Sequence, residues 1–209
     1  TCPKLVTTPR TAEMIKYVSN SLLATMISFS NEIGNMCSAV PGVDARLVWK
    51  GVHLDRRLTP INGQVGGAAG VTEYLWHGLG FGGSCFPKDV AALRSFGRTV
   101  GEQTRMLDAV LDINTDQPLR MVALLEKELS LAGKTVAVLG LAFKPGTDDL
   151  RESPALPLVA ELRKKGAKVL VHDPIAMPHA KKRPEFRDVV FAEDWAEALR
   201  KSDACCLVT

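Results

Sequence analysis

The apolar residues of the first forty positions repeat at helical spacing. From Ala12 to about Val40 they recur every three or four residues, which predicts one helix of about 40 Å at 1.5 Å per residue. Thr11 is the expected N-cap, and Pro41-Gly42 is the expected end. Because the helix is apolar on several sides, it needs a partner surface. That surface is either the protein core or a second copy across a dimer interface.

Shorter helical patterns and one glycine-rich segment follow. Asp44 can cap a second helix, a third is expected over about 87–98, and a fourth over about 102–130. A break of this last helix near 116–118, where a proline stands, is the alternative. Segment 61–70 contains four glycines in ten residues, which predicts a flexible surface loop.

The second half of the chain alternates between two periodicities. Apolar, β-branched runs at 134–143, 167–174 and 204–209 predict buried parallel strands. Amphipathic patterns at 155–166 and 192–203 predict helices between them. This β-α-β-α-β order is typical of a doubly wound α/β domain.

The predicted fold class is therefore mixed, with two domains. We expect an α-helical domain over residues 1–112, followed by a Rossmann-like α/β domain with a parallel sheet over 113–209. Three strands make a thin sheet, and the sequence stops directly after the third. The α/β domain is therefore expected to be incomplete.

Composition narrows the classes of partner. The 209 residues are 46% hydrophobic and 23% charged, and the net charge of +3 does not indicate a nucleic-acid partner. No apolar run approaches the roughly 20 residues that cross a bilayer, and no signal-peptide region is expected. The five cysteines lack C-x-x-C spacing, and the four histidines form no ligand-spaced pair. We therefore expect no disulfide framework, no metal and a reducing, cytoplasmic location.

One motif suggests covalent chemistry. In GLGFGGSCFPKDV, residues 78–90, glycines would let a ligand approach the backbone close to Cys85. If a helix begins here, Cys85 and Asp89 share one face, and Lys88 with the helix N-terminus favours a thiolate. A thiolate beside a carboxylate suits covalent catalysis on a carbonyl. The alternative is a glycine-rich turn with an incidental buried cysteine.

Two further patterns present polar groups. Lys16 and Asn20 are four residues apart on the first predicted helix, where an ammonium and an amide can together stabilise an oxyanion. The alternative for these two is an exposed polar stripe. In GLAFKPGTDDLRES, residues 140–153, Lys144 and Arg151 place positive charge at the strand-to-helix turn where Rossmann-like domains bind phosphates.

Dinucleotide binding at that turn is the less favoured interpretation. The turn is not G-x-G-x-x-G. Asp173 ends the second predicted strand, where a ribose-binding acid would lie, but it follows Gly140 by 33 residues, more than the usual spacing of about 20.

Taken together, these motifs resemble the nucleotide-sugar dehydrogenase family, the UDP-glucose and GDP-mannose dehydrogenases. TAEMIKYVSNSLLATMISFSNEIG resembles the start of the family's central dimerisation domain, and YLWHGLGFGGSCFPKDV resembles its catalytic-cysteine motif. VAVLGLAFKPGTDDLRESPALPLVAEL resembles the opening of its nucleotide-sugar-binding domain. The matches follow the family's order and cover nearly the whole chain.

The resemblance implies a reaction and a role for each polar residue. Family enzymes oxidise a sugar C6 alcohol to a carboxylate with two NAD⁺. Cys85 would attack the intermediate aldehyde, giving a thiohemiacetal and then a thioester that water hydrolyses. Asp89, with Lys16, would activate this water as general base, and Lys16 and Asn20 would stabilise oxyanions. UDP-glucose is the preferred substrate, GDP-mannose is the alternative, and no metal is implied.

The resemblance also implies a substrate-binding set. The sugar would be lined by Gly80, Phe81, Gly82 and Gly83. Tyr74 would lie near the diphosphate, and Lys144 and Arg151 would hold the nucleotide-diphosphate side. Arg57 would reach the substrate of a neighbouring subunit. The implied partners are therefore a nucleotide sugar and a second copy docked through the long first helix, with neither nucleic acid nor membrane.

Two departures from the family pattern affect what this chain is expected to do. No G-x-G-x-x-G follows a first strand, so NAD would be bound mainly by a family domain missing here, and we expect no hydride transfer by this chain alone. The segment between Leu58 and Tyr74 is longer than usual. A non-catalytic dimerisation and nucleotide-sugar-binding module is the alternative function. A cysteine hydrolase is disfavoured, because only His77 lies near the motif.

Overall fold

The chain folds into two compact units. The first holds the described residues up to His77 together with Cys85–Leu111, and the second holds Gly78–Ser84 and Asp112–Thr209. The computed structural model describes three stretches of the sequence, residues 4–55, 57–58 and 70–209. The predicted glycine-rich loop at 61–70 lies outside these stretches except for its last residue.

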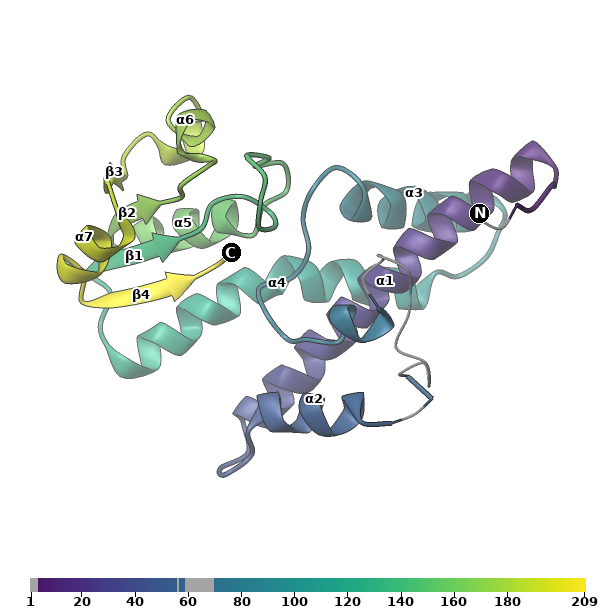
Figure 1. The fold of residues 1–209 in the computed structure, drawn as a ribbon, viewed down its shortest axis with the longest axis horizontal. Helices are drawn as coiled ribbons and strands as arrows, with labels where there is room; N and C mark the ends of the chain where they lie inside the picture. The colour runs from purple at the N-terminus through teal and green to yellow at the C-terminus, as the bar shows by residue number, and fades with distance from the viewer. Residues whose placement is uncertain (1–3, 56, 59–69) are drawn as a thin grey trace. The chain divides into compact units, whose positions relative to one another are not determined.

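The first unit is helical, and the second combines helices with a parallel sheet, as predicted (Figure 1). The helical unit contains α1 (Pro9–Ser38), α2 (Ala45–His53), the short 3₁₀ helix η1 (Val71–Tyr74), α3 (Phe86–Thr99) and the first part of α4 (Arg105–Glu128).

The long helix α1 begins earlier than predicted. Its N-cap is Thr8, whose hydroxyl accepts a hydrogen bond from the backbone N–H of Thr11 at 3.3 Å. The prediction of Thr11 as the cap was wrong because Pro9 follows Thr8. Proline has a helical φ and no N–H to satisfy, so it suits the first position of a helix. The predicted cap of α2 is confirmed, since Asp44 accepts from the backbone N–H of Arg46 at 2.8 Å.

The two sides of α1 differ in the size of their side chains. Its buried positions carry small residues, which allow close packing, namely Ser21, Ala24, Ser28, Ser30, Asn31, Gly34 and Cys37. Its larger apolar residues are exposed in this chain, among them Ile15, Val18, Leu22, Phe29 and Met36. Several of the apolar positions that predicted the helix therefore lie outside the core of this unit.

Helix α4 continues through Pro118, so the alternative of a break near 116–118 was wrong. Two polar side chains on this helix bind a neighbouring loop of the same unit. Asn114 pairs with the backbone of Phe81, and Gln117 donates to the carbonyl of Gly78 at 2.7 Å. Such contacts with tertiary structure can outweigh the local preference of proline to end a helix.

The second unit contains a parallel sheet of four strands in the order β3-β2-β1-β4 (Figure 1). The three predicted strands correspond to β1 (Thr135–Leu139), β2 (Lys168–His172) and β4 (Ala204–Leu207). The prediction of three strands missed β3 (Val190–Phe191). This strand is only two residues long and lies at the sheet edge, so it carries no detectable periodicity.

Helices cover the sheet in the α/β unit. The larger core joins β1 and β2 to α5 (Ala155–Lys164) through buried aliphatic side chains such as Val138 and Leu158. A smaller cluster of Ala137, Ala192 and Ala198 brings α7 (Trp195–Arg200) against β1. The unit also contains α6 (Met177–Ala180) and the 3₁₀ helix η2 (Pro184–Phe186).

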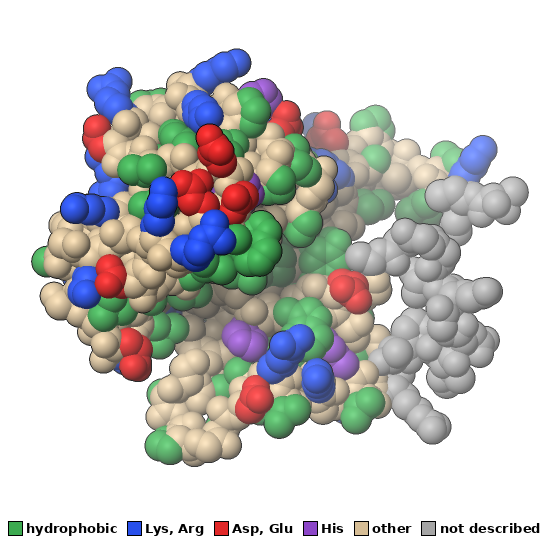
Figure 2. Space-filling view, turned by 60° about the vertical axis from the view of Figure 1, so that its left-hand side comes forward, with side chains coloured by type: hydrophobic (Ala, Val, Ile, Leu, Met, Phe, Trp, Pro, Cys, Tyr) green, Lys and Arg blue, Asp and Glu red, His purple; other side chains and the backbone are tan. Residues whose placement is uncertain are grey.

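Charge is mixed on the surface of this unit. Figure 2 shows Lys, Arg, Asp and Glu side chains interspersed over the visible face of the α/β unit, without a field of one sign. Within the described stretches, no helix is both long enough and apolar enough to cross a membrane.

Candidate active site

A buried carboxylate lies in the first turn of α3. Asp89 is fully buried, and three side-chain nitrogens reach its two oxygens. The Lys16 ammonium donates to Oδ2 at 2.5 Å, and the Asn20 amide donates to the same oxygen at 2.6 Å. The Lys88 ammonium donates to Oδ1. The predicted residues Lys16, Asn20 and Asp89 therefore form one cluster, to which the structure adds a second lysine.

Helical spacing brings the two α1 residues to this carboxylate. Lys16 and Asn20 lie one turn apart on the same face of α1, and α1 packs against α3. The ring of Tyr17 lies 4.7 Å from Lys16 Nζ and 5.8 Å from Lys88 Nζ, within cation–π range. Two ammonium groups and one carboxylate give the cluster a net charge of +1. This charge favours a negatively charged group beside it.

Asp89 stays ionised despite its burial. Burial alone would raise the pKa of this carboxyl, but hydrogen bonds from Lys16, Lys88 and Asn20 outweigh it and lower the pKa from 3.8 to about 2. The same contact raises the pKa of Lys88. A carboxylate with so low a pKa is a weak proton acceptor at neutral pH. The cluster therefore favours Asp89 as an anchor for its donors over Asp89 as the general base.

Cys85 precedes this cluster by one helical turn. It is the N-cap residue of α3, and its carbonyl accepts the backbone N–H of Asp89 at 2.8 Å. The residue is exposed, which contradicts the alternative of an incidental buried cysteine. Cys85 is therefore an exposed thiol at a helix N-terminus, one turn before the Asp89 cluster in the sequence.

The glycines before Cys85 are required by packing inside the α/β unit. A Cβ at Gly82 would overlap the backbone carbonyl of Glu152, and one at Gly83 would lie 2.8 Å from the Phe143 ring. Gly83 also has φ +80° and donates its N–H to the Arg151 carbonyl at 2.8 Å. Protein atoms therefore occupy the side of this backbone that glycine leaves open.

Sequence reasoning missed the residues that hold this glycine segment. Asn114 on α4 brackets Phe81: its Oδ1 accepts the Phe81 N–H at 2.7 Å, and its Nδ2 donates to the Phe81 carbonyl at 3.0 Å. A Cβ at Gly80, whose φ is +101°, would overlap Asn114 Oδ1. The one available signal was a pair of polar amides three residues apart in the helix, Asn114 and Gln117, and this pattern alone names no partner.

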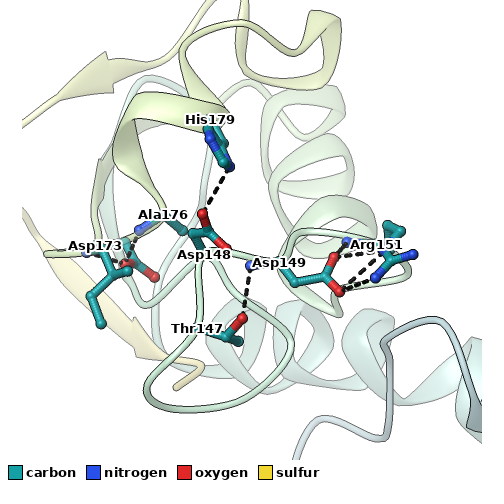
Figure 3. Close-up of polar contacts among 8 residues, drawn as sticks. Thr147, Asp148, Asp149, Arg151, Asp173, Ala176 and His179 are labelled. Atoms are coloured by element: carbon teal, nitrogen blue, oxygen red, sulfur yellow. Dashed lines mark hydrogen bonds and ion pairs between the residues drawn. The ribbon is translucent and has the colours of Figure 1, made fainter.

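Two predicted substrate residues meet at one cavity. Phe81 and Arg151 both line a cavity of about 480 Å³ in the α/β unit. The Arg151 guanidinium forms a fork with Asp149, with its closest nitrogen 2.7 Å from Oδ2, and lowers the pKa of that carboxyl (Figure 3). Lys144 is exposed, and its ammonium lies 5.4 Å from the centre of the Phe143 ring.

The remaining two predicted substrate residues belong to the helical unit. Tyr74 is half-buried, with its ring 6.4 Å from that of Phe86. Arg57 is exposed and forks onto Asp55, with Nε 3.0 Å from Oδ1. The hydrogen bonds from Arg57 lower the pKa of Asp55 to about 2 and raise the pKa of Arg57.

The described residues do not fit a dinucleotide at the turn after β1. Gly140 is closely approached by Thr209, whose backbone nitrogen would lie 2.6 Å from a Cβ at this position. The carboxylate of Asp173, where a ribose-binding acid would lie, is occupied by backbone N–H groups. Among the residues that the structure describes, no group of three or more His, Cys, Asp or Glu side chains is placed to hold a metal ion.

Comparison with known proteins identifies the family. Residues 10–116 match the family model of the UDP-glucose/GDP-mannose dehydrogenase central domain, and residues 137–209 match the model of that family's UDP-binding domain. The chain belongs to the UDP-glucose/GDP-mannose dehydrogenase family. The resemblance inferred from the three sequence motifs is thus confirmed.

Individual members of this family align over most of the chain. The UDP-glucose 6-dehydrogenase AglM of Haloferax volcanii is 45% identical over 95% of the chain, and TuaD of Bacillus subtilis is 40% identical over 99%. A solved UDP-glucose dehydrogenase from Pyrobaculum islandicum is 42% identical and superposes with a TM-score of 0.89 over the whole chain and 45% of its own. The chain spans 43% and 42% of the lengths of AglM and TuaD.

Replacing Asp89 by Asn should destabilise the helical unit and reduce its sensitivity to acid. The amide cannot neutralise two ammonium groups, so we expect a loss of about 1.5–3 kcal/mol in the free energy of unfolding at neutral pH. Because the folded pKa is about 2, below the ordinary 3.8, this stabilisation is present above about pH 4 and lost towards pH 2. The variant should therefore lose less stability on acidification. Urea titrations followed by circular dichroism at pH 7 and pH 3 measure both effects.

Asp44→Asn is the matched control for the Asp89 variant, because Asp44 is an exposed carboxylate that caps α2 and asparagine caps about as well. It should change stability by less than about 0.5 kcal/mol at neutral pH. An Asp89→Asn chain with the same acid sensitivity as wild type would contradict the assigned role of this carboxylate.

Gly82→Ala should destabilise the α/β unit, whereas Gly78→Ala should not. The added methyl group meets the backbone of Glu152 at position 82 but has no atom within 4 Å at position 78. Overpacking against fixed backbone predicts a loss of about 1–3 kcal/mol for Gly82→Ala. Thermal unfolding of both variants measures the difference, and equal melting temperatures would show that the loop relaxes without cost.

Proposed function

We propose that this chain supplies the covalent-catalysis and nucleotide-sugar-binding parts of an NAD-dependent nucleotide-sugar 6-dehydrogenase, with UDP-glucose as the substrate and UDP-glucuronate as the product. One observation carries the proposal. An exposed Cys85 precedes by one helical turn a buried Asp89 that anchors Lys16 and Asn20. A module that only binds or dimerises has no need for this arrangement.

In the proposed reaction, Cys85 acts on the sugar after its C6 alcohol has become an aldehyde. The Cys85 thiolate adds to the aldehyde carbon, and the carbonyl oxygen becomes the oxyanion of a thiohemiacetal. Departure of a hydride from this carbon leaves a thioester. Water then adds to the thioester, and collapse of the tetrahedral adduct releases the carboxylate and returns the thiolate.

The Asp89 cluster supports the stages of this reaction in which negative charge develops on oxygen. The Lys16 ammonium and the Asn20 amide are donors suited to an oxyanion, and both are fixed by the same carboxylate oxygen. Fixed donors stabilise a developing charge without reorganisation, which is the main advantage of an enzyme site over water. In this proposal Asp89 orients the donors, and the net charge of +1 stabilises the oxyanion.

NAD⁺ is the hydride acceptor in the reaction that the resemblance implies. Its oxidised nicotinamide would accept one hydride at each of the two oxidations. The turn after β1 does not fit a dinucleotide, and the proposal gives the described residues no part in binding NAD⁺.

The proposed substrate class rests on the α/β unit and on the relatives. Arg151 and Lys144 are cations on the loop at the carboxyl end of β1, the edge of an open α/β sheet at which ligands bind. The relatives named UDP-glucose 6-dehydrogenase are 37–45% identical to the chain, whereas a solved GDP-mannose dehydrogenase of Pseudomonas aeruginosa is 31% identical. These values favour UDP-glucose over GDP-mannose.

We also propose that the chain forms a homodimer through α1. The exposed apolar residues Ile15, Leu22, Phe29 and Met36 repeat every seven residues, with Val18 between the first two. This spacing is typical of a helix that packs lengthwise against another helix. A patch of this kind on a helix with small buried residues on its other side is typical of a protein–protein interface.

An aldehyde analogue tests the covalent step without a hydride acceptor. UDP-glucose oxidised to the aldehyde at C6 should form a reversible thiohemiacetal with Cys85 and slow its alkylation by iodoacetamide about tenfold or more relative to UDP-glucose. The exposed Cys205 is an internal control whose alkylation should not change. Peptide mass spectrometry measures both rates in one sample.

Three further measurements make this experiment decisive. GDP-mannose and its aldehyde should protect Cys85 less than the UDP sugars do, and calorimetric titration should show saturable binding of UDP-glucose. Lys16→Met should weaken protection by the aldehyde more than it weakens binding of UDP-glucose, because only the adduct carries an oxyanion. Equal alkylation of Cys85 with aldehyde and alcohol would refute the covalent role.

Leu22→Glu should convert the proposed dimer into a monomer, because it places a charge in the middle of the apolar face of α1, where Leu22 is 58% exposed. Met106→Glu, at a 68% exposed position on α4, is the matched control and should leave the mass unchanged. Sedimentation equilibrium measures the mass of each variant. A wild-type chain that sediments as a monomer would exclude the dimer.

A further inference from the structure

Asp173 is a buried carboxylate for which the proposed reaction has no use. It follows β2 directly, is 5% exposed, and accepts four backbone N–H groups. Its Oδ2 accepts from Leu141 at 2.7 Å and from Ala142 at 3.2 Å. Its Oδ1 accepts from Ile175 at 2.8 Å and from Ala176 at 2.7 Å (Figure 3).

Leu141 and Ala142 are also held through their carbonyl groups. Ser153 Oγ donates to the Leu141 carbonyl at 2.7 Å, and Thr209 Oγ1 donates to the Ala142 carbonyl at 2.7 Å. Both the N–H and the C=O of Leu141 and of Ala142 are therefore bound by side chains from three other segments. The carboxylate of Asp173 accepts the N–H of both residues.

Only a carboxylate can fill this position. Four converging N–H donors need four acceptor lone pairs, which an ionised carboxylate offers and an amide, with its own NH₂ donor, does not. Burial would raise the pKa of Asp173, but the four backbone hydrogen bonds outweigh it and hold the pKa below 3.8. The group therefore remains charged and bonded at neutral pH.

The position of this clamp in the fold suggests its purpose. Leu141 and Ala142 open the loop after β1, and they are followed at once by Phe143 and Lys144. Ile175 and Ala176 belong to the loop after β2, so Asp173 ties together two neighbouring loops at the carboxyl edge of the sheet. That edge is where open α/β sheets bind their ligands. Holding a ligand-binding backbone in place before the ligand arrives improves affinity.

We propose that Asp173 is the positioning residue that fixes the backbone of Leu141–Ala142 and so presents the following loop to the uridine diphosphate of the substrate. The inference rests on the proposed function for its ligand, although the clamp itself is a local property of the α/β unit. The acid at the end of β2 thus acts on the protein backbone rather than on a ribose.

The test compares Asp173→Asn with Asp203→Asn in the full 209-residue chain. Asp203 is the matched control, because it also accepts a backbone N–H, that of Thr135 at 2.9 Å, but it does so at the opposite end of β1. Hydrogen exchange measured on peptides that cover 141–144 reports on the clamp. Calorimetric titration with UDP, at a temperature at which circular dichroism shows all chains fully folded, reports on the ligand.

Asp173→Asn should speed exchange at 141–144 and weaken UDP binding by about tenfold or more, while Asp203→Asn should leave both within about twofold of wild type. Weaker UDP binding by a fully folded chain is the readout that a merely structural role would not produce. Faster exchange with unchanged UDP affinity would overturn the inference, and so would unchanged exchange.

Two further results distinguish a failure of folding from a failure of the proposed function. If Asp173→Asn does not fold, Ser153→Ala and Thr209→Val release the carbonyl side of the same two residues and should produce the same effects in weaker form; wild-type exchange and affinity in both would overturn the inference. If wild type itself does not bind UDP, the proposed function fails, and the exchange rates alone then decide whether the clamp exists.

Discussion

The helical unit depends on one buried negative charge. A carboxylate without partners is too costly to bury, so Asp89 requires the ammonium groups of Lys16 and Lys88 and the amide of Asn20. This requirement links the first turn of α3 to the face of α1 that carries the other two predicted residues. Stability and the proposed chemistry therefore use the same contacts, because the donors that make burial tolerable are those that would stabilise an oxyanion.

The α/β unit buries a second carboxylate in a different way, and the difference decides what each can do. Asp173 is satisfied by backbone N–H groups alone, so it adds a fixed negative charge and a rigid pair of loops, and it leaves no side-chain donor for a substrate. Asp89 is satisfied by side chains that remain partly exposed, Lys16 among them at 52%. The first arrangement suits a scaffold and the second suits a reactive centre, although both carboxylates have a lowered pKa.

The sequence predicted most of the elements, and the two helical pairs Lys16–Asn20 and Cys85–Asp89, for reasons that are local. The link between Lys16 and Asp89 came from the family resemblance, and the contact of Lys88 with Asp89 was missed. Helical spacing places Lys16 beside Asn20 and Cys85 beside Asp89, and apolar runs mark β1, β2 and β4. The Thr8 cap of α1 rests on a local signal that the prediction overlooked, the proline after it. The other missed features depend on contacts distant in sequence, since β3 exists only as a partner of β2 and Asn114 meets Phe81 from 33 residues away. Periodicity contains no information about such partners.

The glycines before Cys85 have a physical cause other than the one inferred from the sequence. A bare backbone was interpreted as room for a sugar, yet protein atoms fill the space beside Gly80, Gly82 and Gly83. A missing Cβ frees one direction at each residue, and here that direction is taken up by packing within the α/β unit. Packing against Glu152 and Phe143 holds the segment within the α/β unit, where Phe81, Gly82 and Gly83 are buried. Close packing fixes the backbone that precedes Cys85 in the sequence, and the proposed covalent step would need this order, because a segment free to move could not position a substrate.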